Sequence, residues 1–228
     1  MIPGLSGIIG VAKTSFFIEY LGTTIDTTSN TTYTFAGESL GVAASSREVF
    51  VAVSWKGGAA LRTLSSATIG GISATIHIQD GVSNGSTLSV GAAMISAAVP
   101  TGATGSIVCT FSGSGNTMCG IGKFRVLNRT SIVATAHNSS TFGGSPATSS
   151  VNIDVGANGA LMAAYLESDS GTVTWGNITK QYEADFSPTG HYSGAMSSGL
   201  SSQIGRNITT TQNTSGGSGL AIAIVSIR

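Results

Sequence analysis

Charged side chains are scarce in this 228-residue chain: ten are basic, ten are acidic, and together they make up 9% of the sequence. The formal net charge is zero, so the chain lacks the positive surface that attracts nucleic acid or an anionic membrane. Soluble monomers usually carry more charge, and a net charge that keeps them apart. The scarcity of charge therefore favours a protein that works within an assembly, where neighbours cover much of its surface.

Long apolar runs are also missing. No stretch reaches the roughly 20 apolar residues that span a bilayer, and the longest run, Leu220–Ile227, has the length of a strand. The opening sequence, MIPGLSGIIG, lacks the basic region and the continuous apolar region of a secretory signal. We therefore expect no membrane insertion, and a protein that is made in the cytoplasm.

Only two cysteines are present, Cys109 and Cys119, too few for a disulfide framework. They flank the turn-prone segment Ser112–Asn116, and a hairpin through this segment would place them on adjacent strands. Two interpretations stay open. The cysteines form one disulfide, or they are two small buried thiols in a reduced protein.

Residues suited to catalysis or metal binding form no recognisable motif. His77, His137 and His191 lack zinc-site spacing, and no nucleophile elbow, P-loop or dinucleotide-binding sequence stands between a strand and a helix. Glu183 and Asp185 are two residues apart and share a strand face. A carboxylate pair is the minimum for glycoside hydrolysis, but such pairs more often lie at a solvated sheet edge. We therefore expect no enzyme activity, no cofactor and no metal.

Aromatic residues make up only 7% of the chain, so those on polar strands are candidates for ligand contact. Trp175, Tyr182 and Tyr192 are the candidates for glycan contact, because aromatic faces stack on sugar rings. The alternative for each is packing in the core. A calcium site is left open by three acidic residues, although no EF-hand loop is present: Asp154, Glu167 and Asp169.

Glycine is abundant, with 32 residues, and serine, threonine and asparagine fill much of the remaining sequence. Short apolar or alternating runs are separated by these turn-forming residues, which predicts many β-strands. Glu48–Trp55 alternates four large apolar residues with others, and Ile72–Gln79 places four apolar residues on one face. Asn84-Gly85 predicts a two-residue hairpin turn. Leu88–Ala98 is the best helical candidate, but its glycine and β-branched residues favour a strand.

The second half of the chain has the same texture. The further strands that we expect are Ser106–Phe111, Met118–Leu127, Ser131–His137, Val151–Val155, Ala160–Leu166, Thr172–Trp175, Ile178–Phe186, His191–Ser197, Gln203–Thr211 and Leu220–Ile227. A dozen or so short antiparallel strands predict two packed sheets. The expected fold is an all-β antiparallel sandwich that resembles a jelly roll, with a closed barrel as the alternative.

No shift in composition marks a domain boundary, so residues 15–228 are expected to form a single β-sandwich domain. Residues 1–14 are expected to be an extended N-terminal arm that docks on a partner. The apolar residues of this arm are the candidate assembly anchor: Ile2, Pro3, Leu5, Ile8 and Ile9. The alternative is a frayed tail, which is common at chain ends.

Three segments carry a resemblance to a known class of proteins: Ala67–Thr75, Ala97–Gly102 and Ser106–Ser112. Together with the opening Met1–Gly4, they resemble small β-sandwich virion proteins of tailed bacteriophages, of the tail-fibre, spike or head-decoration type. The match covers about residues 67–112, and the rest of the chain is similar only in texture.

The resemblance implies a structural component that is displayed on the tail or the capsid of the virion after synthesis in the host cytoplasm. It implies assembly as a homo-oligomer, contacts with other virion proteins through the arm, and contact with a host-surface glycan. It brings no catalytic residues. The alternative function is a free carbohydrate-binding module or adhesin.

Overall fold

The computed structural model describes residues 15–113, 117–141, 146–186, 189–213 and 219–228. Every helix or strand within these residues is a β-strand, and neighbouring strands pair antiparallel. The predicted all-β sandwich architecture is therefore confirmed. The expectation of two packed sheets is wrong, because the strands form four sheets.

Two five-stranded sheets lie at the centre of the molecule. Sheet A has the order β1-β9-β3-β7-β6 and consists of Phe17–Asp26 (β1), Thr117–Leu127 (β9), Arg47–Gly57 (β3), Ser89–Ala98 (β7) and Thr75–Ser83 (β6). Sheet C has the order β10-β17-β12-β15-β14 and consists of Ile132–Ser140 (β10), Leu220–Ile227 (β17), Gly159–Glu167 (β12), His191–Leu200 (β15) and Lys180–Asp185 (β14).

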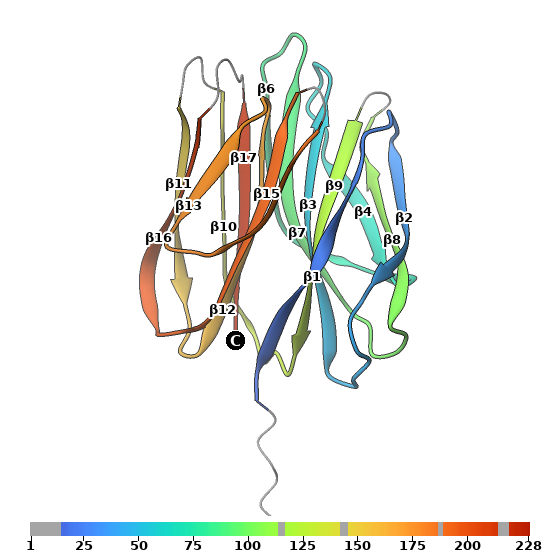
Figure 1. Ribbon diagram of the computed structural model, residues 1–228, viewed down its shortest axis with the longest axis vertical. Coiled ribbons are helices and arrows are strands. Elements are labelled where there is room, and N and C mark those ends of the chain that lie inside the picture. The colour runs from blue at the N-terminus through green and yellow to red at the C-terminus, as the bar shows by residue number, and fades with distance from the viewer. Residues whose placement is uncertain (1–14, 114–116, 142–145, 187–188, 214–218) are drawn as a thin grey trace, which may run out of the picture.

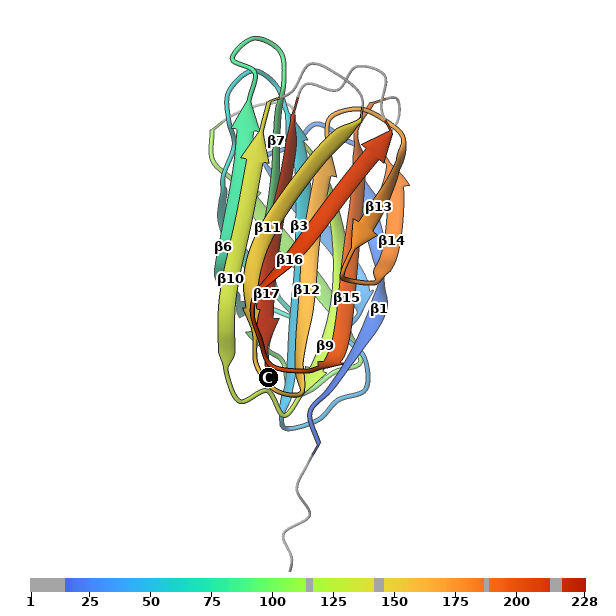
Figure 2. The ribbon, with the colours of Figure 1, turned by 90° about the vertical axis from the view of Figure 1, so that its left-hand side faces the viewer.

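Two smaller sheets cover the outer faces. Sheet B has the order β2-β8-β4-β5 and consists of Thr32–Ser39 (β2), Thr104–Phe111 (β8), Leu64–Ile69 (β4) and Ile72–Ser73 (β5). Sheet D has the order β11-β16-β13 and consists of Ala147–Val155 (β11), Gln203–Asn213 (β16) and Thr172–Gly176 (β13). The layers stack in the order B-A-C-D, as Figure 1 shows, and Figure 2 shows sheet D in front.

Each of the three gaps between layers is filled by its own hydrophobic core. Strand β3 is apolar at successive positions because both of its faces are buried. Val51 and Val53 point into the core between sheets A and B, whereas Phe50 and Ala52 point into the core between sheets A and C. A strand that is buried on both faces reads as a nearly continuous apolar run. The strongest apolar runs of the sequence are therefore the central strands of sheets A and C.

The two halves of the chain have the same strand pairing. In the first half, β1 pairs with the last strand, β9, which pairs with β3, and β3 pairs with β7. In the second half, β10 pairs with the last strand, β17, which pairs with β12, and β12 pairs with β15. The outer sheets follow the same rule, since β2-β8-β4 corresponds to β11-β16-β13. The molecule is thus an internal repeat of one sandwich, residues 17–127 and 132–227.

The central strands of the two halves, β3 and β12, run in the same direction. The Ser54 hydroxyl donates to the carbonyl of Tyr165 at 3.1 Å, and Lys56 Nζ donates to the carbonyl of Ser168 at 2.9 Å. From the first bond to the second, the residue number increases on both strands, as it does when two strands are parallel. Sheets A and C face each other, with β3 opposite β12 and β1 opposite β14, so equivalent strands follow one another in opposite directions across the two sheets. A pseudo-two-fold axis parallel to the strands relates the two halves in this way.

Glycines allow large rings to lie flat against neighbouring strands. A Cβ atom at Gly91 would lie 2.2 Å from the Trp55 ring, and one at Gly120 would lie 2.7 Å from the Tyr192 ring. Both distances are shorter than atoms can approach, so only glycine fits at these positions. Part of the glycine-rich composition is therefore a packing requirement of the cores rather than a property of the loops.

Most of the expected strands are present, with two corrections. Leu88–Ala98 is a strand, as expected, in the form of β7. Ile72–Gln79 is broken at Ala74 into β5 and the start of β6. The prediction of a two-residue turn at Asn84-Gly85 is wrong. Only Gly85 has a positive φ (75°), and the loop of residues 84–88 is longer because Asn84 Oδ1 accepts bonds from the amides of residues 86, 87 and 88.

Candidate functional site

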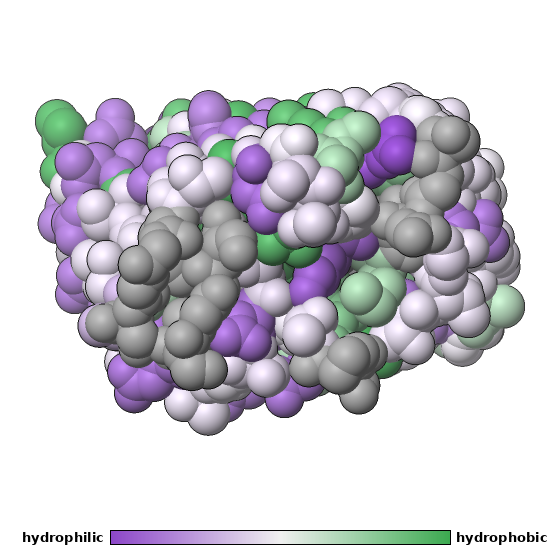
Figure 3. Space-filling view, turned by 90° about the horizontal axis from the view of Figure 1, so that it is seen from above, coloured by the Kyte–Doolittle hydropathy of each residue, from purple (hydrophilic) through white to green (hydrophobic). Residues whose placement is uncertain are grey.

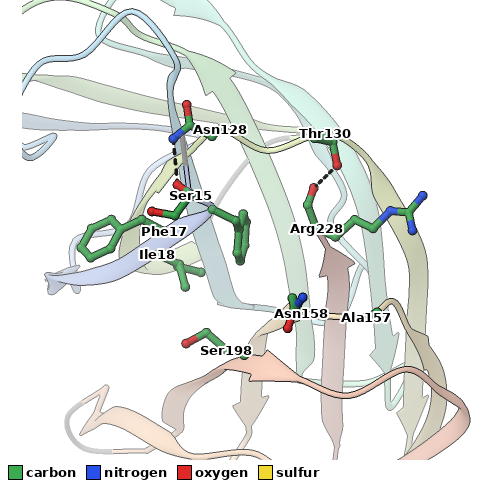
Figure 4. Close-up of a pocket in the computed structure, with 11 residues that line it drawn as sticks. Ser15, Phe17, Ile18, Asn128, Thr130, Ala157, Asn158, Ser198 and Arg228 are labelled. Carbon is green, nitrogen blue, oxygen red and sulfur yellow. Dashed lines mark hydrogen bonds between the residues drawn. The ribbon is translucent and has the colours of Figure 1, made fainter. Parts of the chain in front are cut away.

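A hollow lies at the end of the stack that we call the base, where β1 and β10 begin and β9 and β17 end. Its volume is about 780 Å³. The start of β1 forms one wall, and the turns after β9 and β11, the last residues of β15 and Arg228 after β17 form the others (Figure 4). The hollow therefore opens between the two halves of the chain, with residues of both along its rim: Phe17, Asn128, Asn158, Ser198 and Arg228.

Hydrogen bonds between backbone and side chains fix this rim. Asn128 has a φ of 57°, a conformation that asparagine tolerates better than most residues, and its Nδ2 donates to the carbonyl of Ser15 at 2.8 Å. The carbonyl of Arg228 accepts bonds from the amide and the hydroxyl of Thr130, at 2.6 and 2.9 Å. Figure 4 shows these bonds on opposite sides of the opening. The start of β1 is thus tied to the turn that follows β9.

The wall of the hollow formed by β1 is apolar. Ile18 belongs to the core between sheets A and C, and Phe16 packs against the same core. Phe17 keeps 43% of its surface exposed. Arg228 is the only charged side chain among the residues that line the hollow. The hollow is therefore an extension of the central core that lacks a cover, and its chemistry suits an uncharged, apolar segment.

The carboxylate pair Glu183 and Asp185 lies on β14, next to a buried histidine. His191 is 3% exposed; its Nδ1 lies 2.7 Å from Asp185 Oδ1, and its Nε2 lies 3.3 Å from Glu183 Oε2. Lys180 Nζ donates to Glu183 Oε1 at 2.7 Å. Both carboxylates are thus occupied by bonds within the protein.

Glu183 also covers the open edge of sheet D. The amide of Val173, on the edge strand β13, donates to Glu183 Oε2 at 3.1 Å, and the Val173 carbonyl accepts from Lys180 Nζ at 3.1 Å. Burial opposes ionisation of Glu183, but the hydrogen bonds from Lys180 and Val173 outweigh it and lower the pKa of this carboxyl. Charged groups on an edge strand prevent pairing with another chain. The pair therefore has a structural use that needs no substrate.

The proposed aromatic contact surface for glycans is not formed. Tyr182 is 7% exposed and Tyr192 is 1% exposed, because both rings lie in the core between sheets A and C. Trp175 is half-buried against the ring of Tyr165, and its Nε1 donates to the Ser193 hydroxyl at 3.0 Å. The expectation for Tyr182 and Tyr192 is wrong, because alternation along a strand cannot reveal that a second sheet covers the apparently open face.

The two cysteines are free thiols, both fully buried. They do not lie on neighbouring strands of one sheet, as the hairpin interpretation expected. Cys109 is on β8 of sheet B and Cys119 on β9 of sheet A, and their side chains meet across the core between these sheets. Burial, and then the hydrogen bond with Cys109, raise the pKa of the Cys119 thiol well above its usual value.

A buried acid at the end opposite the base escaped the sequence analysis. Glu167 is fully buried, and its Oε2 accepts bonds from Gln212 Nε2 at 2.7 Å and from the amide of Asp169 at 2.9 Å. Burial raises the pKa of Glu167 from its ordinary value of 4.5 to about 7. The sequence held one signal, since this acid directly follows the uninterrupted apolar run Ala160–Leu166.

The remaining acidic candidates do not gather into a metal site. Asp154 lies on β11 and accepts a bond from the amide of Gly205 at 2.8 Å. Within the described ranges, no group of three His, Cys, Asp or Glu side chains has a geometry that could hold a metal ion. A shallow polar groove of about 420 Å³ lies over β11 and β16, lined by Asn138, Thr148, Ser149, Ser150, Thr209, Thr210 and Thr211.

The residues expected to anchor the chain, Ile2, Pro3, Leu5, Ile8 and Ile9, lie outside the described residues. In the part of the chain that the structure describes, nothing forms a helix of the length and hydropathy that crossing a membrane would need. Comparisons with protein-family models, with curated proteins and with solved structures give no match to this chain.

Proposed function

We propose that this protein is a non-catalytic structural component of a larger particle, of the kind that tailed-phage virions carry on the tail or capsid, and that it attaches through its base. The resemblance of residues 67–112 to small virion proteins supports the phage context. In each half a five-stranded sheet faces a smaller one, of four strands in the first half and three in the second, and the shared order β1-β9-β3-β7 opposite β2-β8-β4 supports a jelly-roll topology.

One observation carries the proposal: the apolar groups that reach the surface are concentrated toward the base. Five large hydrophobic side chains are exposed among the described residues. Four of these lie toward the base, next to the starts of β1, β3 and β16 and at the turn between β4 and β5: Phe17, Val42, Ile72 and Ile204. Single exposed apolar groups are common, but their gathering at the end with an open apolar hollow favours a partner there.

The other faces are suited to solvent rather than to attachment. Seen from the end opposite the base, the surface is mostly near the middle of the hydropathy scale, with scattered apolar residues (Figure 3). The outer face of sheet D carries exposed hydroxyl and amide side chains on all three strands: Thr148, Ser150 and Asn152, with Asn207 and Thr211, and Thr172 and Thr174. Such a face is hydrated without charge, which explains how the protein keeps a polar surface with only 9% charged residues.

The test is incorporation into particles. An epitope-tagged full chain is produced in cells that assemble particles of the phage carrying the gene, and purified particles are examined by immunoblot and mass spectrometry. We expect the tagged chain in the particles, and a loss of at least tenfold for a variant with Ile204→Asp and Phe17→Asp at the base. A matched variant, Leu61→Asp, alters the exposed hydrophobic residue that lies away from the base and should be incorporated normally. Absence of the tagged chain from purified particles would refute the proposal.

A second candidate function, glycan binding, is favoured by the groove over β11 and β16. Its lining offers hydroxyl groups in a regular array and no charge, which suits an uncharged polyhydroxylated ligand. A glycan array tests it with the full chain. Binding that is weakened by Thr148→Val and Thr211→Val, but not by Thr34→Val on the outer face of sheet B, would support it, and an array without hits would exclude it.

A further inference from the structure

We propose that the hollow at the base receives the N-terminal segment of a second copy of this chain, so that copies exchange their segments 1–14. The inference rests on the proposed attachment through the base and identifies one partner that binds there, a second copy of this chain. Its occupant is defined by sequence: residues 1–12 are uncharged, and they include Ile2, Leu5, Ile8 and Ile9.

The chemistry of the hollow matches this occupant. Its wall continues the central core through Phe16 and Ile18, so an apolar side chain placed there leaves water for an existing hydrophobic environment. No acidic side chain lines it, and its single guanidinium belongs to Arg228, so a charged segment would find no partner. The exposed rim groups of Asn158 and Ser198 supply polar atoms for the backbone of a segment that crosses the opening.

The position of Ser15, where the segment joins the described chain, indicates whether residues 1–14 occupy the hollow of their own chain or that of a neighbouring copy. Ser15 lines the hollow and is held to Asn128 through its carbonyl, so residues 1–14 begin at the wall itself. To enter its own hollow, the chain would have to reverse direction within Val11–Thr14. These residues include no glycine, proline, asparagine or aspartate, which favour turns. A neighbouring hollow is reached without a reversal.

The same position constrains the symmetry of the assembly. A segment of 14 residues spans at most about 46–50 Å when extended, and it starts at the rim of its own hollow. The receiving hollow must therefore lie at a neighbouring base. When both copies meet base to base or side by side, each gives a segment and receives one, and the contact closes on itself. We therefore expect a dimer or a small ring rather than an open filament.

The experiment uses the full chain and three variants, with molar mass measured by light scattering during size exclusion. The chain has a mass of 22.8 kDa, and we expect the wild-type mass to be at least twice this value. The segment variant Ile8→Asp/Ile9→Asp should fall to the monomer mass. The hollow variant Ser198→Trp, which places a large ring at an exposed rim position, should also fall to the monomer mass. The control Thr34→Trp adds the same ring to the exposed face of sheet B and should keep the wild-type mass.

Mixing the two defective variants gives the decisive result. The segment variant keeps an open hollow and the hollow variant keeps an intact segment, so a mixture should recover a species of twice the monomer mass. Circular dichroism of each variant checks that a loss of mass does not follow from unfolding. A monomeric wild type at about 100 μM, or an oligomer that neither variant dissociates, would overturn the inference. If the purified chain is monomeric but is still found in particles, the segment binds another protein, and the proposed function stands without this inference.

Discussion

The ring of Tyr182 on β14 occupies the space that a side chain at Gly122 on β9 would need. A Cβ atom at Gly122 would lie 2.2 Å from the phenol ring and its hydroxyl, and one at Gly194 would lie 2.3 Å from the same ring. Tyr182 is therefore held between a glycine of the facing sheet and a glycine of its neighbouring strand. This contact joins the two halves of the chain at the side where β1 faces β14, and the ring of Tyr20 stacks on it at 5.5 Å.

Gly122→Ala is expected to destabilise the protein by about 1–3 kcal/mol, because the added methyl group overpacks the core between sheets A and C. The matched control is Gly58→Ala, since a Cβ atom at Gly58 would meet nothing within 4 Å. Chemical denaturation measures both. Equal stability of the two variants would show that sheets A and C separate easily, contrary to the packing described.

Glu183→Ala is expected to expose the edge of β13 and to cost about 1–2 kcal/mol, because the Val173 amide loses its acceptor. Amide hydrogen exchange should show faster exchange at Val173. Glu183→Gln keeps an oxygen that accepts this bond, so it should have a smaller effect. Asp185→Ala, on the same face of β14, serves as the control and should leave Val173 unchanged. Protection of Val173 that is independent of residue 183 would contradict the role assigned to this acid.

The buried acid Glu167 predicts an unusual dependence of stability on pH. Its pKa is about 7 in the folded protein and near 4.5 when unfolded, so between these values the folded state binds more protons than the unfolded state. Stability contributed by this group is then complete below pH 4.5 and is lost as the pH rises toward 7. Glu167→Gln cannot ionise.

Denaturation of the wild type and of Glu167→Gln between pH 4.5 and 8 isolates this contribution. Titrating groups distant from Glu167 are present in both proteins and cancel in the difference, whereas the interactions of Glu167 with Lys56 and Asp169 form part of the contribution that is measured. We expect the wild type to lose stability relative to the variant as the pH rises. A constant difference across this range would mean that the folded environment does not favour the protonated acid.

Cys109 and Cys119 are expected to be unreactive toward a thiol reagent in the native protein. Both are fully buried, and the raised pKa of Cys119 keeps this thiol protonated, whereas the thiolate is the reactive form. The reagent should count no thiols before denaturation and two after it. A count of zero after denaturation without reductant would instead reveal a disulfide.

The sequence predicted the strands better than their arrangement. Glu48–Trp55 and Ala160–Leu166 were recognisable because apolar strands flanked by turn residues are a local pattern. Their partners were not recognisable, because the pairing of strands far apart in the chain is not a local pattern, and these two runs alone did not reveal the internal repeat. Strands β1 and β2 were missed as well. The threonines and glycine of β1 give no clean alternation, whereas β2 alternates Tyr33 and Phe35 with threonines, a signal that was present in the sequence.

The candidate sites were harder to predict than the fold, for the same reason. Tyr182 and Tyr192 looked like accessible rings because nothing in their own strands indicates the facing sheet A. The hollow at the base could not be anticipated, since its walls come from the start of β1 and from residues at the ends of β9, β11, β15 and β17, which are far apart in the sequence. Glu183 and Asp185 were correctly placed on one strand face, but their engagement with Lys180 and His191 depends on the three-dimensional packing of β13, β14 and β15.

The parallel course of β3 and β12 makes the corresponding ends of the two sandwiches face the same way. Because both sandwiches point the same way, a flat or repetitive surface that contacts one of them lies within reach of the other. The second contact forms at a high effective concentration, so two weak contacts hold far more strongly than either alone. Under the proposed attachment through the base, one chain would therefore present two sandwiches to such a surface before it associates with any other copy.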